Sequence, residues 1–234
     1  MVVASVALAV ALAGCGGGSS AKQKRTTLTV FAAASLTKAF TAEGKAFETT
    51  HPGTKVRFSF AGSQTLVEQI QQGAPADVVA TADQETMDKL TSELASGSSV
   101  LAHNQLALVT PKGNPKHLTA LQDLARPGLK VVLAAPAVPV GKAAAAALTE
   151  AGVTVHPVSL EDAVTGVVSK VRLDEADAGI AYVTDLTAAD VDGVPLPGTT
   201  TTLAVGSLTK EGAAFTAFVL SPEGQQVLAG FGFR

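Results

Sequence analysis

The 234-residue sequence is poor in the side chains that build metal centres and redox sites. It has one Cys, no Trp, one Tyr and four scattered His, so no His/Cys pair has the spacing of a zinc site. Only 16% of the residues are charged and 4% are aromatic, whereas 47% are hydrophobic. The chain can therefore bury one substantial core or two small ones, and we expect no free metal cation, no cofactor and no thiol catalyst.

Basic side chains are scarce outside the N-terminus. The sequence has 17 Lys and Arg against 20 Asp and Glu, and three of these cations but none of the acids lie in residues 1–26. The remainder thus carries a net charge near −6. Nucleic acid is excluded as a partner because it requires a basic surface. Any anion that the protein binds must be held by local dipoles.

A long apolar run occupies the N-terminus and ends at Cys15. The segment MVVASVALAVALAGC is short for a membrane span, which needs about 20 apolar residues, and is typical of a signal segment. Its Leu-Ala-Gly-Cys end resembles a bacterial lipoprotein signal, so we expect residues 1–14 to be removed and Cys15 to be lipidated. An ordinary signal followed by an unmodified Cys is the alternative. Residues 15–26 are rich in Gly, Ser and charge and predict a flexible tether, which would leave an extracytoplasmic protein anchored to the cell membrane.

From residue 27 onward, strand-like and helix-like segments alternate, which predicts an α/β fold with mainly parallel sheets. Loops of small residues follow several strand-like runs. In open α/β sheets ligands bind beyond the carboxyl ends of the strands, so these loops predict a shared site between two lobes. We expect strands at LTVFAA, VRFSFA, DVVATA, LALVT, KVVLAA, GIAYVT and TLAVGSL, and helices over Ser35–Thr49, Gln64–Gln72, Gln84–Leu94, Lys142–Ala151, Asp162–Leu173 and from Pro222, with Ser221 as its cap.

Two serines stand where a strand-like run gives way to a helical pattern. Ser35 does so in TLTVFAAASLTKAF and Ser63 in VRFSFAGSQTLVEQI. Either serine alone could be a plain N-cap, but their matching contexts favour a common ligand. Neither lies in a nucleophile elbow, and no His is placed in a recognisable triad order, so we expect no hydrolase and no other enzyme.

Five segments together resemble a known family. VFAAASLTKAF, FAGSQTLVEQIQQGAPADVVATAD, PAVPVGKAA, GIAYVTD and LSPEGQQVLAGFGF are similar, in this order, to the molybdate-binding proteins of ABC importers, the ModA family. The resemblance implies a two-lobed periplasmic-binding-protein fold of type II. Each lobe would contain a mainly parallel sheet flanked by helices, two crossover strands would join the lobes, and the anion would lie in the cleft. Residues 27–103 and 203–234 would form lobe 1, and residues 104–202 lobe 2.

The resemblance also implies a function and a set of ligand residues. A monomeric receptor would deliver molybdate to an ABC permease and its ATPase, with tungstate, sulfate or another tetrahedral oxyanion as the alternative cargo. Such an anion has only acceptors, so a desolvated site must offer donors: hydroxyls and the unpaired N–H groups of helix starts. Matched to the family, the donors are the hydroxyl and backbone groups of Ser35 and Ser63, the backbone N–H of Val140, the backbone N–H of Val164 or of its rival Ala163, and the hydroxyl of Tyr182. Tyr182 could alternatively be a core aromatic whose hydroxyl is satisfied nearby.

Overall fold

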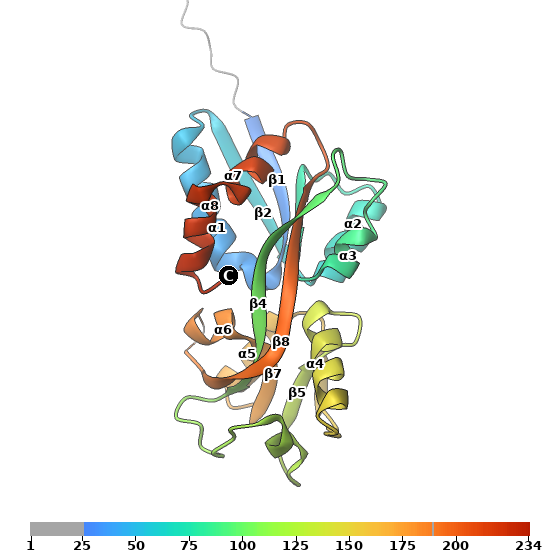
Figure 1. The fold of residues 1–234 in the computed structure, drawn as a ribbon, viewed down its shortest axis with the longest axis vertical. Coiled ribbons are helices and arrows are strands. Elements are labelled where there is room, and N and C mark those ends of the chain that lie inside the picture. Colours follow the sequence, from blue (N-terminus) through green and yellow to red (C-terminus); the bar gives the residue numbers. More distant parts are fainter. Residues whose placement is uncertain (1–25, 189) are drawn as a thin grey trace, which may run out of the picture.

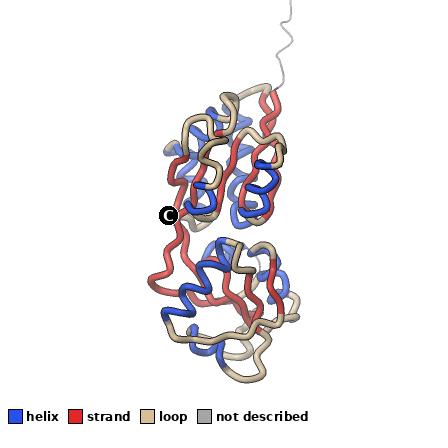
Figure 2. Tube along the Cα trace, turned by 90° about the vertical axis from the view of Figure 1, so that its right-hand side faces the viewer, coloured by secondary structure: helices blue, strands red, loops and turns tan. Residues whose placement is uncertain are grey.

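The computed structural model describes residues 26–188 and 190–234, which form two α/β lobes joined by two long strands (Figure 1). Figure 2 shows the waist between the lobes from the side. The predicted signal segment and all but the last residue of the predicted tether lie outside the described residues. Lobe 1 contains β1 (Thr26–Ala33), β2 (Thr54–Ala61), β3 (Val78–Thr81), a 3-10 turn (Ala34–Leu36), α1 (Thr37–Thr50), α2 (Ser63–Gln71), α3 (Gln84–Asp88), α7 (Ala213–Leu220) and α8 (Pro222–Gly230). Lobe 2 contains a 3-10 helix (Leu121–Ala125), β5 (Val131–Ala134), α4 (Pro139–Glu150), β6 (Ser159–Glu161), α5 (Val164–Arg172), β7 (Ala178–Tyr182) and α6 (Val183–Ala188).

The two lobes share one eight-stranded sheet in the order β2-β1-β3-β8-β4-β7-β5-β6. Within lobe 1, β1 pairs in parallel with β2 and β3, and within lobe 2, β5 pairs in parallel with β6 and β7. Helices cover these strands, and every residue of β3, β5 and β7 is buried. Their continuous apolar character is what parallel strands covered on both faces require. The predicted α/β architecture is confirmed.

The crossover strands are β4 (Ser98–Thr110) and β8 (Asp192–Ser207), which pair antiparallel along most of their length and run through both lobes. In lobe 1, β8 pairs antiparallel with β3, and in lobe 2, β4 pairs antiparallel with β7. These two pairings join the crossover strands to the parallel strands of each lobe. The predicted boundaries between the lobes follow residues 103 and 202. His103 pairs with Thr202, so both boundaries fall at the same point along the paired strands β4 and β8. The division itself stays a prediction.

Register decides where the two serines emerge. Strands β1 and β2 run parallel with Ala33 opposite Ala61, so both strands end at the same edge of the sheet. Ser35 and Ser63 each follow two residues after their strand and therefore leave the same edge. Because that edge faces lobe 2, the sequence motifs are delivered to the waist between the lobes (Figure 1).

The core of lobe 1 lies on both faces of its sheet. On one face, Phe47 on α1 packs edge-to-face against Phe215 and Phe218 on α7, at ring-centroid distances of 5.3 and 5.5 Å. On the other face, a separate apolar cluster includes Leu66 on α2 and Met87 on α3. The helices that begin at the waist are therefore fixed to the sheet, and their N-termini are held in place.

Several predicted boundaries were wrong. Helix α3 ends at Asp88 rather than Leu94; Thr91 donates its hydroxyl proton to the Asp88 carbonyl, a local bond that competes with helix continuation. Helix α4 begins at Pro139, three residues before the prediction, because proline is favoured in the first turn. The predicted strand GIAYVT stops at Tyr182, where α6 takes over. The Ser221 cap is confirmed: its hydroxyl oxygen accepts from the Gly224 N–H.

Candidate functional site

One small pocket at the waist brings together all five residues singled out from the sequence. Ser35 and Ser63 reach it from lobe 1, and Val140, Val164 and Tyr182 reach it from lobe 2. Its remaining lining residues are small or apolar, and none of the lining side chains is charged: Ala33, Ala34, Gly62, Ala82, Val138 and Pro139.

Neither serine is a helix cap. Ala33 is the N-cap residue of the 3-10 turn that contains Ser35, and Gly62 is the N-cap residue of α2, which begins at Ser63. No side chain makes a capping hydrogen bond at either N-terminus. The hydroxyl oxygen of Ser63 accepts a hydrogen bond from the Ala82 N–H at 3.0 Å, so its own proton is left for another acceptor. The hydroxyl of Ser35 is buried and has no protein partner. Both side chains can therefore donate into the pocket.

Tyr182 is buried in lobe 2, with 2% of its surface exposed. Its hydroxyl has no hydrogen-bond partner, so the alternative of a core tyrosine satisfied nearby does not fit. Burial raises the pKa of this phenol far above its usual value, and the negative charges of Asp185 and Asp83 act in the same direction. The group stays protonated and remains a donor at every physiological pH.

Three helices point their N-termini toward the pocket. Ser63 is the first residue of α2, Val140 the second residue of α4 and Val164 the first residue of α5. The N–H groups of a first helical turn lack intrahelical acceptors and carry the positive end of the helix dipole. Ala163, the rival of Val164, is the N-cap of α5 and is not among the lining residues. Fixed partial charges thus converge on a pocket without formal charge.

Direct contacts between the lobes flank the pocket on the side of α2, α3 and α4. Gln64, at the start of α2, donates from Nε2 to the backbone oxygen of Asp162 at 2.9 Å. A Cβ at Gly62 would collide with this same oxygen, so glycine permits the close approach. Lys142 on α4 lies 3.4 Å from the Asp83 carboxylate and 2.8 Å from that of Glu85. The lobes are therefore held closed by protein groups.

Asp185 stands behind Tyr182 in the first turn of α6. Its carboxylate accepts a hydrogen bond from the Tyr182 N–H at 3.0 Å. Burial raises the pKa of Asp185 to about 7, although the Tyr182 hydrogen bond and the nearby Lys38 ammonium act to lower it. Sequence reasoning missed Asp185 and the contacts between the lobes, since a single chain gives no signal for pairs far apart in sequence.

Two kinds of feature are absent from the described residues. In residues 26–188 and 190–234, no cluster of three or more His, Cys, Asp or Glu could hold a metal ion. Nor does this part of the chain contain a helix long and apolar enough to cross a membrane. Two lobes closed over a small, donor-lined and uncharged pocket define a binding protein for a compact ligand rich in acceptors.

Comparison with known proteins agrees with this class. The chain belongs to the family of bacterial extracellular solute-binding proteins, whose family model matches residues 28–234. It is 38% identical to the molybdate-binding protein ModA of Mycobacterium tuberculosis over 98% of this chain and 95% of the relative. It is 30% identical to a putative ABC transporter substrate-binding lipoprotein of Bacillus subtilis over 78% of this chain and 74% of the relative. The resemblance found in the sequence motifs is confirmed.

A solved structure shares the fold. The periplasmic molybdate-binding protein of Azotobacter vinelandii superposes with a TM-score of 0.76 over 88% of this chain and 98% of its own, at 19% identity. At this level of identity the likeness concerns the two-lobed fold alone.

Proposed function

We propose that the protein is an extracytoplasmic receptor that binds molybdate in the pocket at the waist and delivers it to an ABC importer. One observation carries the proposal. The hydroxyls of Ser35 and Tyr182 come from opposite lobes, are buried and have no protein partner. Unpaired buried hydroxyls cost free energy, and a ligand made only of acceptors removes that cost by bonding to both lobes at once.

Neutral donors suit a tetrahedral dianion. In the proposed complex, the hydroxyls of Ser35, Ser63 and Tyr182 and the N–H groups of Val140 and Val164 would each donate to an anion oxygen. Val164 is preferred to Ala163 because it lines the pocket and opens α5. Without a formal counter-charge, binding stays tight yet reversible. No group is assigned to covalent chemistry, and we expect no turnover of ester substrates.

Calorimetric titration of the ligand-free protein tests this function. Molybdate and tungstate are expected to bind, and sulfate more weakly, because its shorter bonds place its oxygens too far from donors fixed on rigid helices. Phosphate near neutral pH carries a proton, and the pocket lining offers no carboxylate to accept it, at a cost of about 1–3 kcal/mol. Equal affinity for sulfate and molybdate would refute the assigned cargo.

The contacts between the lobes give a second prediction. Lys142→Met removes the ion pairs with Asp83 and Glu85, which are partly exposed, so the closed state should lose a few tenths to about 1 kcal/mol. Molybdate affinity should fall about two- to fivefold at low ionic strength, and the loss should shrink in high salt. Lys130→Met, at the amino end of β5 away from the waist, is the matched control. An equal effect of both variants would remove the role assigned to Lys142.

The lipid anchor is a further part of the proposal. It rests on the Leu-Ala-Gly-Cys end of the apolar run and on the Gly/Ser-rich segment after it, which lie outside the described residues. Expression of Cys15→Ser in a Gram-positive host should release the protein into the medium with its molybdate affinity intact, and fractionation followed by titration measures both. Retention of the variant in the membrane would contradict lipidation at this residue.

A further inference from the structure

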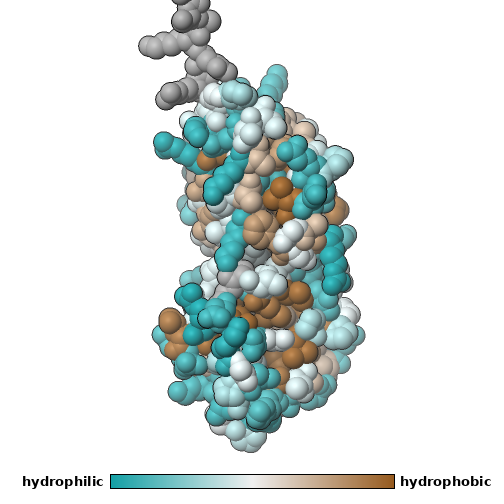
Figure 3. Space-filling model, turned by 90° about the vertical axis from the view of Figure 1, so that its left-hand side faces the viewer, coloured by the Kyte–Doolittle hydropathy of each residue, from teal (hydrophilic) through white to brown (hydrophobic). Residues whose placement is uncertain are grey.

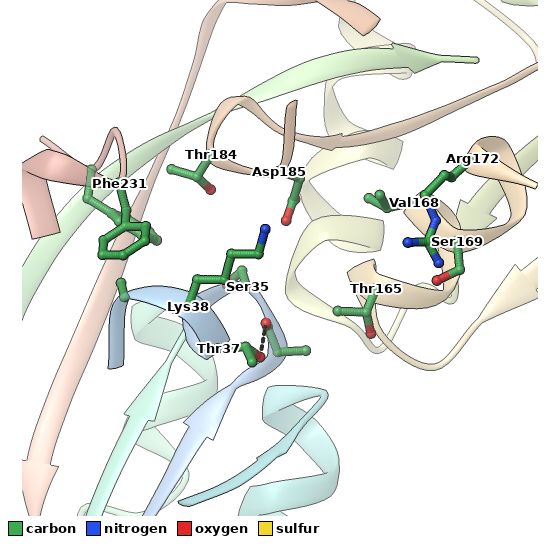
Figure 4. A pocket seen from close by; sticks show the side chains of 13 residues that line it. Ser35, Thr37, Lys38, Thr165, Val168, Ser169, Arg172, Thr184, Asp185 and Phe231 are labelled. Carbon is green, nitrogen blue, oxygen red and sulfur yellow. Dashed lines mark hydrogen bonds between the residues drawn. The ribbon is translucent and has the colours of Figure 1, made fainter. Parts of the chain in front are cut away.

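A second, larger cavity lies beside the pocket at the waist. It has a volume of about 230 Å³ and is lined by residues of both lobes (Figure 4). Ala34 and Ser35 line both spaces, so the cavity and the pocket adjoin at the 3-10 turn that precedes α1. Figure 3 views this side of the molecule, where hydrophobic side chains gather below the waist on lobe 2. Because the two spaces share these lining residues, the cavity lies next to the pocket on the Ser35 side.

On the side of α2, α3 and α4, contacts between the lobes cross the waist. Gln64 of α2 is bonded to the backbone of Asp162, just before α5. Lys142 joins the start of α4 to Asp83 and Glu85 at the start of α3. An ion leaving between α2 or α3 and lobe 2 would have to break these bonds. None of these contact residues lines the cavity beside α1, α5 and α6.

Charge also distinguishes the cavity from the side of the waist formed by α2, α3 and α4. The cavity lining contains Lys38 and Arg172 and a single carboxylate, Asp185, whose pKa is raised to about 7 by burial. Lys38 extends toward Asp185, while Arg172 lies on the opposite wall beside Ser169 (Figure 4). Arg172 is exposed and, among the described residues, forms no ion pair. On the other side of the waist, Lys142 faces two carboxylates.

A dianion meets net repulsion from most of this protein, because residues 27–234 carry a charge near −6. A cleft with an excess of positive charge lowers that repulsion locally and raises the rate of association. We propose that the oxyanion enters and leaves through the cavity beside Ser35, and that the guanidinium of Arg172 steers it inward. This inference rests on the proposed function and adds to it the route of the anion.

Stopped-flow mixing with molybdate, followed by the emission of Tyr182, tests the steering. Tyr182 is the only Tyr in a chain without Trp, so it dominates the emission; kinetic calorimetry measures the same rates independently. Arg172→Gln should lower the association rate constant about three- to tenfold at low ionic strength, and Arg172→Glu more. The difference should vanish in high salt, and the dissociation rate constant should not change. Arg57→Gln removes the same charge from an exposed position on β2 and should leave association close to wild type.

A steric variant tests the route itself. Ser169→Trp narrows the cavity from α5 without touching the pocket, so it should slow association and dissociation by similar factors and leave the dissociation constant unchanged. Thr154→Trp, at an exposed loop position of lobe 2, is the control. Kinetic calorimetry follows both variants, because the new Trp would mask the emission of Tyr182. Equal association rates for Arg172→Gln and Arg57→Gln, or unchanged rates in Ser169→Trp, would overturn the inference. Absence of any molybdate binding to the wild type would instead refute the proposed function.

Discussion

Replacing Tyr182 by phenylalanine is expected to weaken molybdate binding by about 1.5–3 kcal/mol, the range for a hydrogen bond to a charged group. The ligand-free protein should nevertheless be at least as stable as the wild type. The reason is that the Tyr182 hydroxyl is buried without a partner, so its removal breaks no bond and relieves an unsatisfied group. Calorimetry gives the affinity, and urea unfolding of the ligand-free protein gives the stability.

Ser63→Ala is the informative comparison. It removes a donor from the other lobe and should weaken molybdate binding by a similar amount. Here the ligand-free protein should also lose about 1–2 kcal/mol of unfolding free energy, because the Ala82 N–H then has no acceptor in the core. Full molybdate affinity in both variants would remove these hydroxyls from the site. A loss of stability in Tyr182→Phe would show that its hydroxyl has a partner in the ligand-free state.

Much of this site is readable from the sequence, and the reason is local. Each lobe-1 serine follows its strand after one small residue, and parallel strands with matched ends bring such positions to one edge. Tyr182 likewise ends β7, and Val140 and Val164 open helices. A donor that sits at a strand end or a helix start is placed by the same short segment that encodes it. The fold class follows from the same alternation of segments.

The features that escaped prediction depend on distant partners. Lys142 lies in the segment PAVPVGKAA, but its pairing with Asp83 spans 59 residues and requires the closed arrangement of the lobes. The crossover strands extend well beyond the expected LALVT and TLAVGSL because they pair with each other across the waist. Ser159–Glu161 is too short to register as a strand by itself, and its parallel pairing with β5 creates it. Tertiary context, which a single sequence does not contain, decides all three.

Glu43 gives the largest expected effect on stability. It lies on α1 with 0% of its surface exposed, and both carboxylate oxygens lack hydrogen-bond partners. Burial raises its pKa to about 8, and the negative charge of Glu223 on α8 adds to the shift. Between the unfolded pKa near 4.5 and this value, the folded state holds a proton that the unfolded state has released. The unfolding free energy should therefore fall as the pH rises from 5 to 9, by on the order of 2–4 kcal/mol, and then level off.

Urea unfolding across this pH range, with variants of α1, measures the effect. Glu43→Gln is neutral at every pH and should flatten the decline, although part will remain because Asp185 also has a raised pKa. Glu43→Met, which removes the unsatisfied oxygens at similar volume, should be more stable than the wild type at pH 9. Glu48, on the same helix, is a control because its effect on the unfolding free energy has the opposite pH dependence. Its hydrogen bond with Lys55 lowers its pKa, so the stability that Glu48 contributes is lost as the pH falls. If Glu43→Gln kept the wild-type dependence between pH 5 and 9, the carboxylate at residue 43 would be ionised in the folded protein, and a counter-charge would have to compensate its burial.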